Sequence, residues 1–273
     1  MDIDRNAPVG VFDSGVGGLT VAREIMRNLP AEKIVYFGDT ARVPYGNKSR
    51  ETVIRYSRQI IRFLREQQVK AIVVACNTAS AFALDAIRDD LDIPILGVIE
   101  PGAKVAAAQT RNKRVGVIGT LGTVGSGIHR EYLKKYDPDI QVFAKACPLF
   151  VPLVEEGWLH DPVTVEVASR YLKELQDKNV DTLILGCTHY PLIRSIIRNI
   201  MGEGVCLVNP AYETALELGR LLEEKNLLST GTQQEEFPYR FYVSDLADEF
   251  KAFAGSILPY DVEMTQKIDI EKY

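Results

Sequence analysis

Val73-Val74-Ala75-Cys76-Asn77-Thr78 and Ile184-Leu185-Gly186-Cys187-Thr188-His189 are two stretches built in the same way. In each, a short apolar run leads into a cysteine, and small polar residues follow directly. Apolar runs of this length, rich in Val and Ile, are typical of buried strands in a parallel sheet. In open α/β sheets, ligands bind at the carboxyl ends of the strands. The pattern therefore predicts two cysteines, one from each half of the chain, that face one substrate.

Strands and helices alternate on both sides of these two stretches. The alternation predicts an α/β fold of doubly wound, mainly parallel sheets. Strands are expected at 9–12, 34–37, 73–76, 93–98, 114–118, 140–146, 184–187, 205–208 and 239–243. Helices are expected from Leu19, from Ser49, at 79–91 and 103–109, from Pro162, from Pro191, and at 211–225 and 245–254.

The second half of the chain repeats the plan of the first. Val9-Gly10-Val11 and Val115-Gly116-Val117 both open a strand that ends in a small, polar turn, and the two cysteine strands follow at a similar distance. This predicts two pseudo-symmetric lobes with the active site in the cleft between them. Lobe A, residues 1–98 plus 210–273, carries Cys76, and lobe B, residues 99–209, carries Cys187.

The C-terminal part is expected to return to lobe A. Residues 227–238 are expected to form a polar connection before the strand at 239–243. The segments 262–264 and 268–270 are expected to be edge or tail segments.

Composition excludes several classes of protein. The chain has 273 residues, 46% of them hydrophobic and 25% charged, which is typical of a globular protein. A net charge of −5 argues against a general nucleic-acid binder, which would need a basic face. The sequence holds no apolar run long enough to span a membrane, and its N-terminus is too polar for a signal peptide. We expect a cytoplasmic protein without nucleic-acid or membrane partners.

The chain has four cysteines and no CxxC pair, so disulfides are not expected. Cys147 and Cys206 lie in or beside apolar runs and are predicted to be small buried core residues. Cys76 and Cys187 differ because polar, ligand-ready residues flank them. Two thiols on opposite sides of a carbon could remove a proton from one face and deliver one to the other. His189 is a candidate partner that would lower the pKa of Cys187.

Other interpretations of the same residues remain open. A single Cys–His nucleophile would leave the second cysteine unexplained. Three histidines without a CxxC pair make a metal site unfavourable, since such a site needs three or four converging ligands. Both cysteines could also be core residues. The glycine-rich turn at 13–18 is a natural anion site before a helix, but it lacks the lysine of a nucleotide loop, and a carboxylate would suit it as well as a phosphate.

Several motifs together resemble those of the bacterial glutamate racemases, in the cofactor-independent aspartate/glutamate racemase superfamily. The resemblance covers residues 9–253. The motifs are Phe12-Asp13-Ser14-Gly15-Val16-Gly17-Gly18, Gly38-Asp39-Thr40, Pro44-Tyr45-Gly46, Ala75-Cys76-Asn77-Thr78 and Leu185-Gly186-Cys187-Thr188-His189-Tyr190-Pro191.

The resemblance implies racemisation of glutamate by two bases, without a cofactor or a metal, to supply D-glutamate for peptidoglycan. It implies that Cys76 takes the α-proton of D-glutamate and Cys187 that of L-glutamate. Asp13 and His189 would assist the thiols, with Asp39 and Glu155 as further possible helpers. The implied substrate-binding positions are Asp13, Ser14, Tyr45, Gly46, Asn77, Thr78, Thr120, Thr123, Thr188 and His189. Such proteins are often homodimers.

Two alternative functions stay open at this point. A racemase of aspartate or another acidic amino acid would carry the same thiols. A two-lobed protein that binds a small molecule without catalysis would share the fold.

Overall fold

The chain folds around two separate sheets, and every pair of neighbouring strands is parallel. The computed structural model describes residues 3–229, 231, 238–260, 262 and 265–273. The first sheet has the strand order β10-β9-β2-β1-β3-β4 and the second the order β6-β5-β7-β8. The strands are β1 (Val9–Asp13), β2 (Ile34–Gly38), β3 (Ala71–Val74), β4 (Ile95–Gly97), β5 (Arg114–Gly119), β6 (Gln141–Ala146), β7 (Thr182–Gly186), β8 (Cys206–Val208), β9 (Tyr239–Val243) and β10 (Gln266–Lys267).

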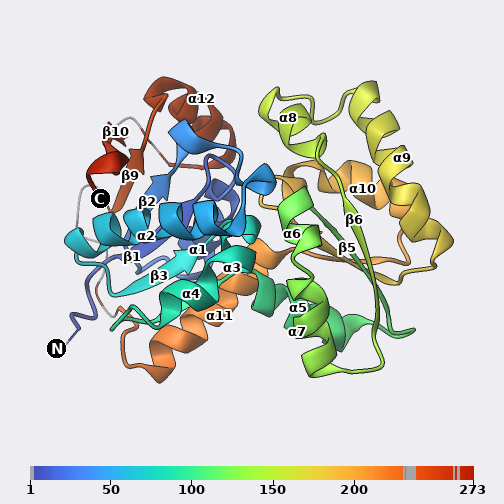
Figure 1. Ribbon diagram of the computed structural model, residues 1–273, viewed down its shortest axis with the longest axis horizontal. Helices are drawn as coiled ribbons and strands as arrows, with labels where there is room; N and C mark the ends of the chain where they lie inside the picture. The colour runs from blue at the N-terminus through green and yellow to red at the C-terminus, as the bar shows by residue number, and fades with distance from the viewer. Residues whose placement is uncertain (1–2, 230, 232–237, 261, 263–264) are drawn as a thin grey trace.

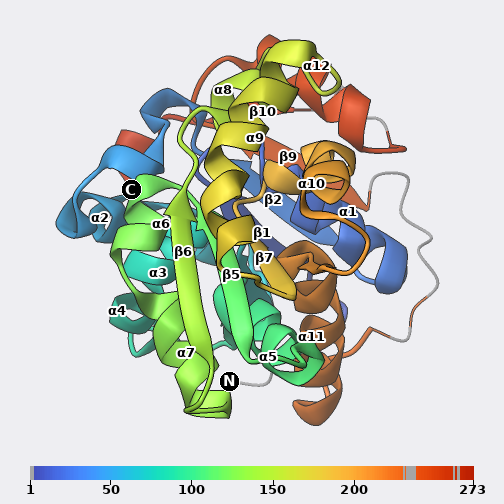
Figure 2. The same ribbon diagram turned by 90° about the vertical axis from the view of Figure 1, so that its right-hand side faces the viewer.

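Helices cover both faces of each sheet (Figures 1 and 2). On the first sheet, α1, α11 and α12 share one apolar core, and α2, α3 and α4 share the core on the other face. On the second sheet, α5 and α7 cover one face, and α8, α9 and α10 the other. The helices are α1 (Leu19–Asn28), α2 (Arg50–Glu66), α3 (Asn77–Phe82), α4 (Leu84–Arg88), α5 (Ile99–Gln109), α6 (Leu121–Gly125), α7 (Ile128–Tyr136), α8 (Phe150–Glu155), α9 (Pro162–Asp177), α10 (Arg194–Met201), α11 (Pro210–Glu224) and α12 (Ala247–Ile257).

The two halves repeat the same strand order. In the first sheet, β1 lies between β2 and β3, and β4 follows β3; in the second, β5 lies between β6 and β7, and β8 follows β7. Cys76 comes after β3 and Cys187 directly after β7, which are equivalent strands. This confirms the predicted α/β fold with two pseudo-symmetric, doubly wound lobes. The equivalence places each cysteine at the carboxyl end of a central strand.

The chain leaves the first sheet after β4 and returns to it after β8. Strand β9 pairs with β2, so the C-terminal part completes the first sheet. The starts of α5 and α11 touch where the chain crosses between the sheets: a Cβ built on Gly102 would lie 3.1 Å from Cγ of Pro210. In the part of the chain that the structure describes, no helix is both long and apolar enough to cross a membrane.

Some helix boundaries differ from the predicted ones. The helix expected at 79–91 is two short helices, α3 and α4, which meet at Ala83. Helix α5 begins four residues early, so Pro101 lies in its first turn, where proline is tolerated because the N–H it lacks would have no helical partner. The helix expected from Pro191 begins as a 3-10 turn, Tyr190–Ile193. The helix expected at 245–254 is displaced to Ala247–Ile257.

Other differences concern elements outside the main pattern. Helices α6, α7 and α8 were not predicted. Strand β10 lies between the two edge segments expected at 262–264 and 268–270, and residues 263 and 264 lie outside the described part. Much of the polar connection expected at 227–238 also lies outside it.

The two cysteines predicted to be core residues differ from each other. Cys147 is fully buried, as predicted. Cys206 is only partly buried, because it opens the edge strand β8.

Candidate active site

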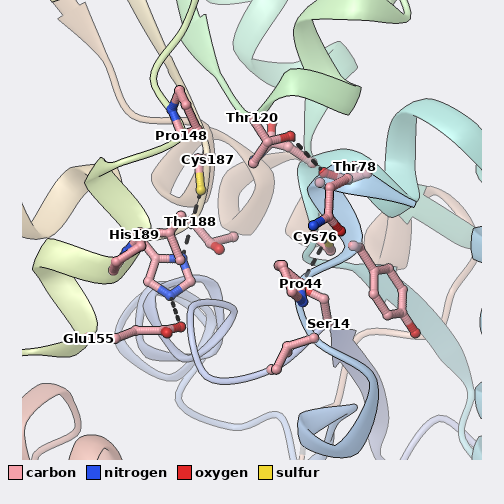
Figure 3. Close-up of a pocket in the computed structure, with 18 of the residues that line it drawn as sticks. Ser14, Pro44, Cys76, Thr78, Thr120, Pro148, Glu155, Cys187, Thr188 and His189 are labelled. Carbon is pink, nitrogen blue, oxygen red and sulfur yellow. Dashed lines mark hydrogen bonds and ion pairs between the residues drawn. The ribbon is translucent and has the colours of Figure 1, made fainter. Parts of the chain in front are cut away.

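A cavity of about 450 Å³ lies between the two sheets, where the carboxyl ends of their central strands meet. Both sheets contribute to its walls, and both predicted thiols line it. Figure 3 shows Cys76 and Cys187 on opposite sides of this space. The predicted site residues that line it are Ser14, Tyr45, Gly46, Cys76, Asn77, Thr78, Thr120, Glu155, Cys187, Thr188 and His189.

Cys76 caps the start of α3 and is 5% exposed. Its sulfur accepts a hydrogen bond from the backbone N–H of Ala79 at 3.4 Å and lies 3.6 Å from Oγ of Ser14. Burial, reinforced by the charge of Asp13, raises the pKa of the Cys76 thiol to about 12, against the smaller effect of these hydrogen bonds. At neutral pH Cys76 is therefore held in its protonated form.

Asp13 ends β1 and lies behind the cavity wall, 1% exposed. Its Oδ2 accepts a hydrogen bond from the N–H of Gly15 at 3.0 Å, and its buried Oδ1 has no partner among the described residues. Burial raises the pKa of Asp13, while the charge of His189 and backbone N–H groups, that of Gly18 first, oppose the increase. Asp13 thus lies within electrostatic reach of both cysteine sides.

Cys187 lies at the end of β7 beside His189. Its sulfur is 3.7 Å from Nδ1 of His189, and Nε2 of that ring is 2.9 Å from Oε1 of Glu155 (Figure 3). Burial opposes a charge on this ring, but the hydrogen bonds to Cys187 and Glu155 and the electrostatic attraction of the same two groups together outweigh it and raise the pKa of His189 to about 10. His189 is therefore in its charged form at neutral pH.

Three threonine hydroxyls join the two sheets at another edge of the cavity. Oγ1 of Thr78 lies 3.0 Å from that of Thr120 and 3.2 Å from that of Thr123, and the last two are 3.0 Å apart. Thr123 does not line the cavity, but it holds the two threonines that do. Beside them, the buried Oδ1 of Asn77 has no partner in the described part of the chain, which leaves it available to a ligand. Hydroxyls and an amide of this kind suit a carboxylate and an ammonium group.

The 3-10 turn Tyr45–Asn47 forms a further wall. The hydroxyl of Tyr45 donates to Oδ2 of Asp39, which itself does not line the cavity. Asp39 also accepts from Oγ of Ser244 at 2.8 Å and from Nε of Arg42 at 2.8 Å. The structure thus places Asp39 beneath Tyr45 as its support, behind the cavity wall.

A wall from α8 and the residues that precede it was missed by the sequence reasoning. It consists of Pro148, Val151, Pro152 and Glu156, together with Glu155. This segment is short and has no regular polar pattern, so only the resemblance pointed to Glu155. No three His, Cys, Asp or Glu side chains come together as a possible metal site in residues 3–229, 231, 238–260, 262 and 265–273.

Comparison with known proteins adds independent observations. The model of the Asp/Glu/Hydantoin racemase family matches residues 9–217. A glutamate racemase of Geobacter metallireducens is 52% identical over 242 residues, 89% of this chain and 89% of that protein.

Two solved structures superpose over nearly the whole chain. The crystal structure of a glutamate racemase isoform from Bacillus anthracis gives a TM-score of 0.93 at 40% identity and covers 97% of this chain and 98% of that one. The structure of glutamate racemase from Francisella tularensis in complex with D-glutamate gives 0.91 at 40% identity, with 98% and 100% covered. With its paired strand-end thiols, this chain belongs to the Asp/Glu/Hydantoin racemase family.

Proposed function

We propose that this protein is a glutamate racemase, which interconverts L- and D-glutamate with two thiols as its acid and base. The observation that carries the proposal is the position of Cys76 and Cys187, which line opposite sides of one cavity at equivalent strand ends. Relatives named glutamate racemase, at up to 52% identity, and a superposable structure with bound D-glutamate support glutamate as the substrate.

In the proposed reaction, the thiolate of Cys187 removes the α-proton of L-glutamate and becomes a thiol. The electron pair left on the α-carbon then takes the proton of the Cys76 thiol from the opposite face, which forms D-glutamate and a Cys76 thiolate. D-glutamate reacts by the same steps in reverse. After either turnover, a proton must pass from the new thiol to the new thiolate, with solvent as carrier, before the same enantiomer can react again.

The two thiols differ in their surroundings. Burial and the charge of Asp13 raise the pKa of the Cys76 thiol, which keeps it protonated. On the other side, Nδ1 of His189 lies 3.7 Å from the Cys187 sulfur. Stabilisation of the charge on the α-carbon would come from preorganised hydrogen-bond donors around the α-carboxylate in a site that excludes water.

The proposal is tested by incubating the purified protein with L-glutamate in D₂O. We expect D-glutamate to appear, with deuterium at its α-carbon, and the rate to be insensitive to chelators and to added pyridoxal phosphate. A protein that only binds would incorporate no deuterium. Faster turnover of L-aspartate than of L-glutamate would instead support the alternative substrate.

The remaining expectations are also proposals. The division into lobe A, 1–98 plus 210–273, and lobe B, 99–209, is supported by the strand composition of the two sheets. We propose that the protein acts in the cytoplasm, where it supplies D-glutamate for peptidoglycan, and that it forms a homodimer, which analytical ultracentrifugation would test.

A further inference from the structure

The start of α1, which belongs to the first sheet, packs directly on the loop that follows Cys187 in the second. Thr20 in the first turn of α1 is fully buried, and its hydroxyl is 2.9 Å from the carbonyl oxygen of Thr188. The same hydroxyl is also 2.9 Å from the carbonyl oxygen of Gly17, three residues earlier in its own turn. None of the sequence motifs pointed to Thr20 as a site residue.

The carbonyl oxygen of Thr188 depends on this hydrogen bond because its own 3-10 turn offers it no backbone donor. The residues after it form a 3-10 turn in which the N–H of Tyr190 donates to Cys187 at 3.1 Å and that of Leu192 to His189 at 3.0 Å. The N–H that would reach the carbonyl of Thr188 in this series belongs to residue 191, which is a proline and has none. A buried carbonyl without a donor is costly, so the Thr20 hydroxyl supplies the missing bond from the other sheet.

The two acceptors of Thr20 are not equivalent. A hydroxyl has one proton and can donate fully to one acceptor at a time. The carbonyl of Gly17 already accepts the backbone N–H of Thr20 at 3.0 Å, so it does not depend on the hydroxyl. The carbonyl of Thr188 is thus the acceptor that depends on the Thr20 hydroxyl, and the hydrogen bond holds α1 against the loop after Cys187.

Gly17, just before α1, also packs closely against the loop after Cys187. A Cβ built on Gly17 would lie 2.5 Å from Cε1 and Nδ1 of His189 and still closer to Oγ1 of Thr188. Its three nearest neighbours thus all belong to the loop after Cys187. Only a residue without a side chain lets α1 approach the His189 ring this closely.

We propose that Thr20 is a positioning residue for the Cys187 side of the site. Gly17 allows this contact because it has no side chain that would collide with Thr188 and His189. By donating to the carbonyl of Thr188 from the other sheet, Thr20 fixes the loop that carries His189 against Cys187. This inference rests on the proposed racemase function and adds to it a contact between the two sheets that orients His189.

The test replaces Thr20 by Val, which keeps the shape and removes the hydroxyl, and by Ser, which keeps the hydroxyl. T20V is expected to lower kcat/KM for glutamate by about 5- to 100-fold, most of it in kcat, because the buried carbonyl of Thr188 then loses its donor and the loop after Cys187 is held less well. T20S is expected to stay within about threefold of the wild type. Hydrogen–deuterium exchange of the peptide 187–193 is expected to be faster in T20V and unchanged in T20S.

A second pair of variants tests the contact without changing a hydroxyl. G17A is expected to lower kcat/KM by at least about 100-fold and to speed exchange in 187–193, since the new methyl group collides with the His189 ring. The matched control is G204A, where an added Cβ meets nothing within 4 Å, and it should behave as the wild type.

The proposal is overturned if T20V and T20S lose activity equally, or if T20V matches the wild type in both rate and exchange. If T20V does not fold, wild-type rate and exchange in G17A overturn it instead. The proposed racemase function is tested only by whether the wild-type protein racemises glutamate, and not by the variants. Exchange in 187–193 does not depend on turnover, so a failure of the positioning proposal is distinguishable from a failure of the function.

Discussion

The Cys76 and Cys187 sides of the cavity follow equivalent strands but differ in their electrostatics. Cys76 follows β3 and Cys187 follows β7, and these two strands hold equivalent positions in their sheets. Burial and the charge of Asp13 raise the pKa of Cys76 to about 12, although a serine hydroxyl and a backbone N–H beside it act in the opposite direction. Cys187 has a histidine whose own pKa is raised to about 10. The comparison shows that equivalent strand ends can place two thiols in different surroundings, one beside an acid and the other beside a histidine.

Removal of either thiol is expected to have the largest effect. C76A and C187A should each lower racemisation by at least about a thousandfold, because each enantiomer needs one base and one acid. Proton exchange should separate the two sides: in D₂O, C76A is expected to exchange the α-proton of L-glutamate only, and C187A that of D-glutamate only. Chiral chromatography with mass spectrometry measures both.

The partly buried Cys206 offers a matched control for these variants, since C206A removes a thiol from an edge strand away from the cavity. It should keep wild-type activity. The same exchange pattern in C76A and C187A would contradict the assignment of one thiol to each face.

A smaller and pH-dependent effect is expected from Glu155, whose contact raises the pKa of His189. E155Q should lower that pKa, so the alkaline limb of the kcat/KM profile for L-glutamate should move to lower pH by about one unit. The raised pKa in the folded protein also means that the His189 contacts stabilise the fold fully below pH 6.5 and lose this effect as pH rises through about 10.

The stability difference between wild type and E155Q should therefore shrink toward alkaline pH, as urea unfolding at several pH values would show. E131Q, which changes an exposed acid on α7, is the control and should leave the profile unchanged. An unshifted alkaline limb in E155Q would mean that the charge of His189 does not limit the reaction.

The smallest effect on the reaction is expected beneath the Tyr45 wall. D39N weakens the support of the Tyr45 hydroxyl and of Arg42, both of which contact Asp39. We expect KM for glutamate to rise about threefold to tenfold with little change in kcat, and the free energy of unfolding to fall by about 1–3 kcal/mol. D92N, at an exposed ion pair, is the control. A large loss of kcat in D39N would instead give Asp39 a direct part in the chemistry.

Local patterns predicted most of the strands and both thiols, because a buried parallel strand leaves a short apolar run in the sequence and a strand-end site leaves polar residues after it. They did not predict α8, which contributes Val151, Pro152 and Glu155 to one wall of the cavity, since a helix of six residues has too few positions to show a period.

Contacts between distant residues were also beyond the sequence. Thr20 and Thr188 are 168 positions apart in the sequence. The hydrogen bond from Tyr45 to Asp39 depends on the conformation of the turn between them, which the sequence pattern does not determine. Resemblance indicated which residues gather at the site, but not that Asp13, Asp39 and Thr123 lie behind its walls.

The contact between Gly102 and Pro210 bears on how the molecule could be divided. The two points where the chain passes between the sheets lie against each other, so the second sheet and its helices form an insertion with adjacent ends. A chain in which residue 98 is joined to residue 210 by a short linker would keep all the strand pairs of the first sheet. Such a chain would contain Cys76 but not Cys187. The Cys76 side of the site could then be studied as a separate molecule.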